Sequence, residues 1–505
     1  HPVPLMMTSD NQDDPVFLWR GLLLDICRHW ISPASIHRTL DAMALARLNV
    51  LHLHLSDDQA HRVESRAWPR LHSVAHDGAF LTHEELRELV GHAAHLGIRM
   101  VPELDMPGHT SAWLAAYPHL AASGTEAPSE ARRPIGIAGV AIDPEAETTF
   151  EFLAALMDEV VTLFPDTHLH LGGDEVAAEA WPGRSVPEAQ AAFTDRVVAM
   201  AIERGRTPVL WDEAWHPGLD RRAVVQVWRG HRRLLAMASE GRPVLLSTPY
   251  YLDLAYKPIH HHVAPSATAA EWLAAREELW ADPAHCHMAP LVQGVEGALE
   301  LEVADAPDEL DEAALANVLG GEACMWTELC PQGLLDLRLW PTAVVVGDAL
   351  HDGVAPAARG PEAEASLRRR LDSFEEELRG VGIDLATQRR ARWLALAAGD
   401  AAMADDLATL ASACTPATWY LRHGLVPDQL LDQPFDRFVD TLGPWARASS
   451  GDPEVAAAAA RLSGRLANTP DPRLAEVAQL AQHVTAGGDG PAELVGEVVV
   501  HHTSP

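Results

Sequence analysis

The stretch His168-Leu169-His170-Leu171-Gly172-Gly173-Asp174-Glu175-Val176 decides how the rest of the chain is interpreted. It begins as an alternating apolar run typical of a strand, reaches two glycines, and then presents two adjacent carboxylates. Neighbouring side chains on an extended backbone point to opposite sides, so Asp174 and Glu175 can face one ligand only if the chain leaves the strand there. Gly172 and Gly173 permit that exit. An Asp-Glu pair that caps the following helix is the simpler alternative, and the rest of the chain decides against it.

The length and composition indicate an ordinary globular protein with more than one core. At 505 residues, with 48% hydrophobic and 22% charged residues, we expect one large domain and an appendage. Lys+Arg 38 against Asp+Glu 72 gives a net charge of −34, which argues against nucleic acid and against anionic membrane surfaces. No apolar run approaches the length of a membrane span, and no secretion signal is visible. The localisation is left open.

Short apolar runs alternate with amphipathic segments up to about residue 353, which is the pattern of βα units and a parallel sheet. Eight candidate strands predict a closed (β/α)8 barrel, the TIM barrel of the α/β class, over residues 1–353. The candidate strands are Gly21–Ile26, Val50–Leu55, Ile98–Glu103, Thr167–Gly172, Thr207–Trp211, Val224–Val227, Pro243–Leu246 and Val318–Met325.

Helices are predicted between these strands and throughout residues 354–505. The Thr82-x-x-Glu85 pattern is a capping box that opens one of them. After Gly353 the chain becomes rich in proline, alanine and glycine and then in apolar helical periodicity, so an α-helical C-terminal domain with a structural role is expected. The candidate helices are Ser35–Ala46, Thr82–His95, Glu145–Leu163 and Pro187–Arg204, followed in the tail by Glu362–Arg379, Leu385–Cys414 and Val455–Ala467.

Polar and aromatic residues gather where the predicted strands end, and in a barrel these positions converge on one rim. Flat sugar faces stack on indole rings and sugar hydroxyls pair with charged groups, so such a rim favours carbohydrate recognition. The sequence lacks the glycine patterns of phosphate and dinucleotide sites. The rim residues are Arg28, His29, His54 to Asp58, Glu103, Asp105, His109, Asp174, Glu175, Trp211, Asp212, Glu213, Trp228, Tyr251, Asp253, Trp326 and Glu328.

Two groups of potential metal ligands are assigned no metal. His260-His261-His262 lies in a long insertion and is expected to form a solvent-exposed loop, because no carboxylate or cysteine stands near it at ligand spacing. The five cysteines are odd in number and lack CxxC spacing, which predicts buried free thiols. They are Cys27, Cys286, Cys324, Cys330 and Cys414.

With these residues in place, the chain resembles glycoside hydrolase family 20, the β-N-acetylhexosaminidases. The resemblance runs in the family's order from about residue 14 to residue 345, and chance agreement over that length is negligible. It rests on Trp19-Arg20-Gly21, Arg28-His29, Leu48-Asn49-Val50, His52-x-His54-Leu55-x-Asp57-Asp58-Gln59, Pro102-Glu103-Leu104-Asp105-Met106-Pro107-Gly108-His109, Phe164-Pro165-Asp166, His170 to Val176, Val225-Gln226-Val227-Trp228 and Gly320-Gly321-Glu322-Ala323-Cys324-Met325-Trp326-Thr327-Glu328.

The resemblance implies a role for each matching position. Glu175 would be the general acid/base, and Asp174 would orient the 2-acetamido group of the substrate and stabilise the charge that develops on it. The resemblance further implies that sugar hydroxyls lie between Arg28 and Glu328, and that Asp57, Asp105 and His109 tune the acid without touching substrate. The implied pocket residues around the sugar ring and its acetamido group are Trp211, Trp228, Tyr251, Asp253 and Trp326.

The resemblance also implies substrate-assisted hydrolysis of terminal non-reducing β-linked N-acetylglucosamine or N-acetylgalactosamine, with retention of configuration through an oxazolinium intermediate. No metal or organic cofactor is required. Glu175 is expected to have a raised pKa, because a tryptophan-lined pocket and a neighbouring carboxylate favour the protonated form. The expected partner is a carbohydrate or glycoconjugate substrate. A homo-oligomer is left open, since neighbouring subunits in this family sometimes complete a pocket.

The chain departs from the family pattern at two points. Gly347-Asp348-Ala349-Leu350-His351 stands where the last barrel helix in the family tends to read Gly-Glu-Arg-Leu-Trp. A tryptophan that often closes the sugar pocket from the long loop has no fixed counterpart, and Trp272 and Trp280 are the candidates. Neither departure touches a residue given a role.

Two other functional classes are weighed against a glycosidase. His52-x-His54 and His168-x-His170 resemble the metal pairs of amidohydrolase-type barrels, but no lysine or further histidine follows the fourth to sixth strands as a metal bridge, so these histidines are interpreted as packing and hydrogen-bonding residues. A catalytically silent glycan-binding protein is the other alternative. The intact Asp174-Glu175 pair argues against it.

Overall fold

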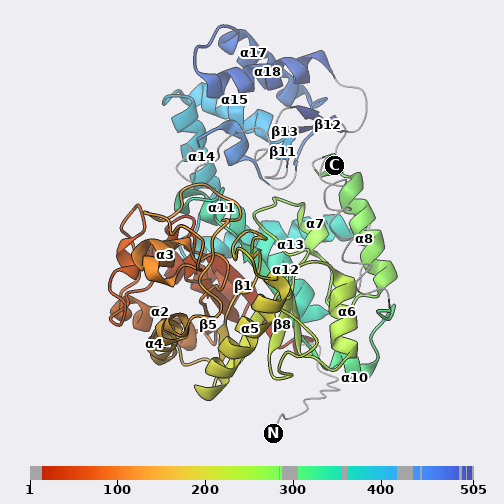
Figure 1. Ribbon diagram of the computed structural model, residues 1–505. Coiled ribbons are helices and arrows are strands. Elements are labelled where there is room, and N and C mark those ends of the chain that lie inside the picture. Colours follow the sequence, from red (N-terminus) through yellow and green to blue (C-terminus); the bar gives the residue numbers. More distant parts are fainter. Residues whose placement is uncertain are drawn as a thin grey trace.

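The computed structural model describes residues 14–283, 285–286, 305–340, 342–353, 361–417, 436–443, 446–487, 492–495 and 498–502. Within these residues, eight parallel strands close into a barrel in the order β1-β10-β9-β8-β7-β6-β5-β2 (Figure 1). The predicted barrel is therefore confirmed, and the strands fall close to their predicted positions. The barrel strands are β1 (Trp19–Asp25), β2 (Val50–His54), β5 (Arg99–Glu103), β6 (His168–His170), β7 (Thr207–Trp211), β8 (Val224–Val227), β9 (Val244–Leu246) and β10 (Val318–Met325).

Helices surround the barrel, and short elements decorate its loops. The predicted capping box is present: the Thr82 hydroxyl accepts from the amide of Glu85, and the Glu85 carboxylate accepts from the amide of Thr82 at 2.8 Å. The elements are α1 (Pro33–Leu45), β3 (Ser56–Asp57), β4 (Ala60–His61), η1 (Leu71–Ser73), α2 (His83–His95), α3 (Ser111–Ala116), η2 (Pro118–Leu120), α4 (Glu147–Leu163), α5 (Val186–Glu203), α6 (His231–Ser239), α7 (Pro258–His261), α8 (Ala269–Ala281), α10 (Glu312–Leu315), η4 (Gln332–Leu334), α11 (Leu335–Leu339) and α12 (Thr342–Asp352).

The barrel interior is built in layers because side chains two residues apart on a strand point the same way. An apolar layer that contains Trp19, Val50 and Val101 closes one end. Two residues further along, a polar layer follows, in which the buried Glu322 carboxylate accepts from Trp19 at 2.6 Å and from Gln226 at 2.9 Å. Gly21 leaves room for this side chain, since a Cβ there would lie 2.3 Å from Glu322 Cγ. The next layer is the rim.

The C-terminal region is helical but contains a small sheet that the sequence analysis missed. The predicted helix Leu385–Cys414 is wrong as one element, because the chain turns at Ala398 and Gly399, both with positive φ, and its last residue begins a strand. That strand belongs to an antiparallel sheet of order β11-β13-β12. The elements are α13 (Pro361–Gly380), α14 (Leu385–Leu396), α15 (Ala401–Ala411), β11 (Cys414–Pro416), η6 (Phe438–Thr441), α17 (Pro453–Leu466), α18 (Pro472–Ala486), β12 (Ala492–Val495) and β13 (Val498–His501).

Helix α13 belongs to the hydrophobic core of the barrel. Its residues Leu371, Phe374 and Leu378 are fully buried in the same cluster as the barrel helices, whereas a second cluster starts at Leu396 and holds α15, α17 and α18. In Figure 1 these later helices lie beyond one end of the barrel, with α14 leading to them. A domain boundary at residue 353 stays a prediction, and this packing favours one after α13.

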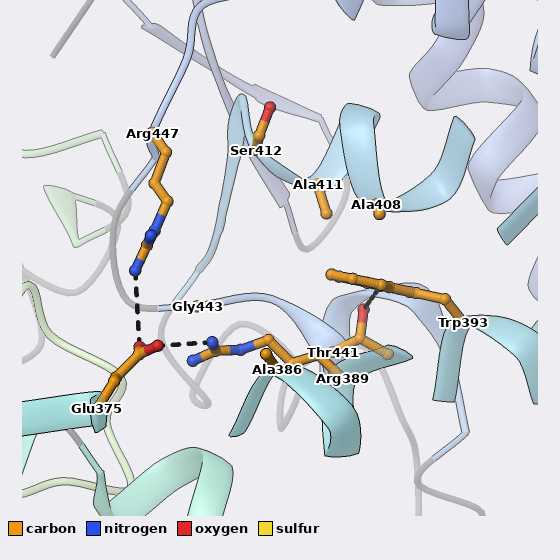
Figure 2. A pocket seen from close by; sticks show the side chains of 10 residues that line it. All are labelled: Glu375, Ala386, Arg389, Trp393, Ala408, Ala411, Ser412, Thr441, Gly443 and Arg447. Atoms are coloured by element: carbon orange, nitrogen blue, oxygen red, sulfur yellow. Dashed lines mark hydrogen bonds and ion pairs between the residues drawn. The ribbon is translucent and has the colours of Figure 1, made fainter. Parts of the chain in front are cut away.

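A pocket lies at the junction of α13, α14 and the C-terminal cluster (Figure 2). Two guanidinium groups are directed at one carboxylate there: Arg389 Nη1 lies 3.5 Å and Arg447 Nη2 3.6 Å from Oε1 of Glu375. On the other side, the indole of Trp393 donates to the Thr441 hydroxyl at 3.0 Å. These contacts tie the two hydrophobic clusters together.

Three further predictions, on membrane spans, cysteines and the histidine tract, can be compared with the structure. Among the described helices, none is long and apolar enough to cross a membrane. All five cysteines are free, and four are buried as predicted, but Cys286 is exposed. The expected exposed loop at His260-His261-His262 is wrong: His260 and His261 are buried at the end of α7, and Asp282, at the end of α8, lies 3.7 Å from His260 Nε2.

Candidate active site

A pocket with a cavity of about 210 Å³ opens where the barrel strands end. Every residue that the sequence analysis placed in contact with substrate lines it, and these residues lie at or after the ends of β1, β6, β7, β8, β9 and β10. The lining residues are Arg28, Asp174, Glu175, Trp211, Trp228, Tyr251, Asp253, Trp326 and Glu328, together with Ile135, Gly136, Ile137 and Leu254.

The last four lining residues were missed. Ile135 to Ile137 come from the long loop between η2 and α4, which lies away from any strand end and carries no motif. Ile137 is 49% exposed, which is unusual for a large apolar side chain beside a pocket. The candidates Trp272 and Trp280 do not line the pocket. Trp272 is buried on α8, where its ring stacks on His231 at a centroid distance of 4.6 Å.

The turn after β6 explains how two neighbouring carboxylates reach one pocket. Gly172, Gly173 and Glu175 all have positive φ, at 66°, 106° and 52°, so the chain leaves the extended conformation as the two glycines predicted. A Cβ at Gly172 would lie 1.7 Å from Oδ1 of Asp105, and the Gly173 amide donates to that same oxygen at 3.1 Å. The Asp105 carboxylate therefore stabilises the turn by packing against Gly172 and accepting a hydrogen bond from Gly173.

Glu175 is linked to the barrel interior through His109. Nε2 of His109 lies 3.4 Å from Glu175 Oε2, and its Nδ1 lies 3.4 Å from Asp57 Oδ1. The other Asp57 oxygen lies 2.8 Å from both His54 Nε2 and Arg28 Nη2. Asp57 is buried between these cations, which hold its pKa well below its usual range against the opposing effect of burial. All three residues predicted to tune the acid thus surround the Asp174-Glu175 turn.

Arg28 faces the pocket with its charge balanced by carboxylates. Its Nη1 lies 3.3 Å from Asp25 Oδ2, and its Nη2 lies 3.9 Å from Glu328 Oε1. The guanidinium carbon also lies 5.1 Å from the ring centroid of Trp326. Asp25 in turn accepts from the Thr327 hydroxyl at 2.9 Å. The ends of β1 and β10 are thereby locked together around a cation and a carboxylate that can bind neighbouring hydroxyls.

The aromatic walls are held in fixed orientations. The indole of Trp211 donates to the buried Glu103 at 2.9 Å, and its ring centroid lies 5.9 Å from that of Trp326. The ring centroids of Trp228 and Tyr251, which also line the pocket, lie 6.5 Å apart. Tyr251 is placed by a parallel bridge to Cys324 that extends β9 along β10. The rigid walls suit a flat, hydroxyl-bearing ring.

The charge state of the two carboxyl groups differs from the expectation. Burial acts to raise the pKa of Glu175, but the hydrogen bond from His109 and the positive charges of His109 and Arg28 outweigh it, so the pKa of Glu175 is lowered. The predicted raised pKa of Glu175 is wrong. Burial and the charge of Asp105 raise the pKa of Asp174 well above its ordinary value, and burial raises that of Asp105 to about 7.

The histidines of the amidohydrolase alternative lie beneath the pocket and do not line it. Nδ1 of His52 lies 2.9 Å from Glu322, and its Nε2 lies 3.2 Å from Glu103. Burial opposes protonation of His52, but Glu322 and Glu103 prevail and raise its pKa to about 9. His170 and Glu103 complete a group with metal-ligand spacing. The carboxylate contacts of His52 and His170 agree with the interpretation as packing and hydrogen-bonding residues.

The comparison with known proteins agrees with this geometry. Residues 17–352 match the model of "Glycosyl hydrolase family 20, catalytic domain". The chain belongs to glycosyl hydrolase family 20. Among curated relatives, the β-hexosaminidase subunit beta of Entamoeba histolytica is 32% identical over 350 residues, which are 65% of this chain and 57% of the relative. A β-hexosaminidase of Porphyromonas gingivalis is also 32% identical, over 64% of this chain and 45% of the relative. The chain thus spans about half the length of these relatives.

Solved structures extend the similarity of this family 20 chain beyond the barrel. Flavobacterium johnsoniae chitobiase superposes with a TM-score of 0.77 at 28% identity, over 94% of this chain and 71% of that one. A mutant Streptomyces plicatus β-hexosaminidase in complex with its product N-acetylglucosamine superposes with a TM-score of 0.55 at 27% identity, over 73% and 70% of the two chains.

Proposed function

We propose that this protein is an exo-acting β-N-acetylhexosaminidase that removes terminal non-reducing β-linked N-acetylglucosamine, and N-acetylgalactosamine where the pocket admits an axial 4-hydroxyl. The observation that carries the proposal is the turn after β6, which presents Asp174 and Glu175 to one aromatic-walled pocket together with Arg28 and Tyr251. The names of the relatives and the product bound to the Streptomyces plicatus structure support the same substrate class.

The proposed reaction proceeds in two displacements with no enzyme nucleophile. In the first, the acetamide oxygen of the substrate attacks the anomeric carbon, the glycosidic bond breaks, and the leaving oxygen takes a proton from Glu175. Asp174 stabilises the positive charge on the acetamide nitrogen of the cyclic intermediate. In the second, Glu175 takes a proton from water, which attacks the anomeric carbon as the bond to the acetamide oxygen breaks. The two inversions retain the configuration.

In the proposed reaction, the substrate must redistribute a proton between the two carboxyl groups. The raised pKa of Asp174 and the lowered pKa of Glu175 favour a proton on Asp174, whereas catalysis needs it on Glu175. The acetamide N–H of the substrate donates to ionised Asp174 in our proposal and so favours that form. A sugar ring that excludes water from Glu175 favours its protonated form for the same reason that burial does. Substrate binding would thus prepare the acid.

The test distinguishes the roles of the two carboxyl groups by comparing, for each variant, a substrate with a poor leaving group and one with a good leaving group. Glu175→Gln should lower kcat/KM on an unactivated disaccharide by about 10²–10⁴-fold and far less on a nitrophenyl glycoside, which departs without protonation. Asp174→Asn should impair both substrates alike. Glu188→Gln is the control, because Glu188 is an exposed carboxyl group on α5 that does not line the pocket, and it should keep the parent's ratio between the two substrates.

Two further results would contradict the proposal. A covalent glycosyl adduct on Asp174 or Glu175, detected by mass spectrometry with a fluorinated sugar, would reveal an enzyme nucleophile. Equal turnover of glucosides and N-acetylglucosaminides would remove the acetamide from the mechanism. A glycan-binding protein without catalysis would bind N-acetylglucosamine and turn over neither substrate.

A further inference from the structure

Two histidines and a glutamate converge in the C-terminal region, outside the pocket that holds the proposed activity. His483 lies near the end of α18, Glu493 lies on β12, and His502 directly follows β13. One ring nitrogen of each histidine and a carboxylate oxygen of Glu493 all lie within 4.8 Å of one another. Three separate elements therefore deliver ligand atoms of the kind that transition metals prefer.

The distances suit a tetrahedral ion. Oε2 of Glu493 lies 3.1 Å from His483 Nε2 and 3.7 Å from His502 Nε2. Zinc bonds of about 2.0–2.1 Å place tetrahedral ligand atoms about 3.3–3.4 Å apart, and the two separations bracket that value. Both Nε2 atoms are buried, and in the described part of the chain they make no hydrogen bond beyond these contacts with Glu493. Their lone pairs are available to an ion at the centre of the group.

A neighbouring hydroxyl fixes the orientation of one ring. The Ser450 hydroxyl lies 2.7 Å from Nδ1 of His502, and the Ser450 amide donates to the His501 carbonyl at 2.7 Å. An Nδ1 atom that is engaged in this way leaves Nε2 to bind a metal, which is the usual arrangement around zinc. Glu493 is half-exposed, at 46%, so solvent can reach the remaining coordination position.

A second group of two histidines and a carboxylate, His260, Asp282 and His285, differs from this one because a lysine ammonium contacts its carboxylate. There, the ammonium of Lys257 lies 2.5 Å from Oδ2 of Asp282, and Nε2 of His260 lies 3.7 Å from that same oxygen. A built-in cation already occupies the position that a metal would need. Among the described residues, Glu493 has ion-pair contacts with the two histidines and with no lysine or arginine.

We propose that His483, Glu493 and His502 bind one Zn²⁺ ion, with water in the fourth position and Ser450 orienting His502. The ion joins α18 to the terminal β12–β13 hairpin. Because the site forms only in the folded chain, bound zinc stabilises the fold through linkage. Hard cations such as Mg²⁺ and Ca²⁺ prefer oxygen ligands and are excluded.

The test uses the full chain after dialysis against a chelator. Zn²⁺ should bind with a stoichiometry near one per chain by calorimetry and raise the unfolding temperature, whereas Mg²⁺ should do neither. Co²⁺ in place of Zn²⁺ should give the intense visible absorption of a tetrahedral site. Turnover of a chromogenic substrate serves only as a check on folding, since none of the three ligands lines the catalytic pocket.

Variants separate this site from adventitious histidine binding. His483→Gln and His502→Gln should abolish the tetrahedral Co²⁺ spectrum, and Ser450→Ala should weaken zinc binding about 10-fold while keeping the spectrum. His37→Gln is the matched control, because His37 and His92 lie with Asp41 in a more exposed group of similar composition. Binding that is lost in His37→Gln and kept in His483→Gln would overturn the proposal, as would the absence of any zinc-dependent rise in unfolding temperature.

Discussion

Nε2 of His109 lies 3.4 Å from Oε2 of Glu175, so the proposed acid of this enzyme rests against a buried imidazole. Burial opposes protonation of His109, but Asp57 and the hydrogen bond to Glu175 raise its pKa well above the ordinary value. These contacts therefore favour the protonated, positively charged ring. Its positive charge lowers the pKa of Glu175 and also counts against protonation of Asp174.

The first prediction follows from that charge. Replacing His109 by Asn removes an influence that lowers the pKa of both carboxyl groups, so both pKa values rise. Because catalysis requires one ionised and one protonated carboxyl group, both limbs of the pH profile of kcat/KM should move to higher pH, by about one unit. His95→Asn, at an exposed position on α2, should leave the profile unchanged. An unshifted profile in a folded His109→Asn variant would contradict the proposed coupling.

The second prediction concerns the apolar edge of the pocket. Ile137 is 49% exposed, and a substrate that covers it would bury apolar surface worth about 1 kcal/mol. Ile137→Ser should therefore raise KM about fivefold with little change in kcat, because this contact is the same in the ground state and the transition state. Leu273→Ser is the control. Leu273 is also an exposed branched aliphatic residue, but it lies on α8 and outside the pocket, so its replacement should leave KM unchanged. A fall in kcat at constant KM would argue for a different role.

The third prediction concerns the close approach of α12 to the residue that follows α1. A Cβ at Gly347 would lie 2.0 Å from the carbonyl oxygen of Ala46, so Gly347→Ala should destabilise the fold by about 3 kcal/mol. Gly91→Ala is the control within α2. Nothing lies within 4 Å of a Cβ there, and the higher helix propensity of alanine should stabilise by about 1 kcal/mol. Chemical denaturation measures both changes, which should have opposite signs.

The fourth prediction assigns α13 to the barrel. Phe374 is fully buried and its ring lies 5.7 Å from that of Trp340 in the barrel core. Phe374→Ala should cost about 3–5 kcal/mol of stability and leave KM unchanged at temperatures where the chain stays folded. The nearby exposed Glu376→Ala should have little effect. A small cost at Phe374 would place α13 outside the barrel core and restore a boundary near residue 353.

The sequence by itself determined the barrel and which residues line the candidate site. Strand and helix periods are local properties, and the two glycines before Asp174 are a local demand for positive φ, so both could be read from neighbouring residues. The rim followed because all strands of a parallel barrel end at the same side.

Only the tertiary structure decided the features that join distant segments. The lowered pKa of Glu175 depends on His109 and Arg28, the burial of His260 depends on a loop folding back over it, and Ile137 reaches the pocket from a loop without a motif. The residues of β11 and β13 lie more than eighty positions apart, yet their backbones pair. Such contacts leave no period in the sequence, because each is set by packing and charge between residues that the chain itself does not place side by side.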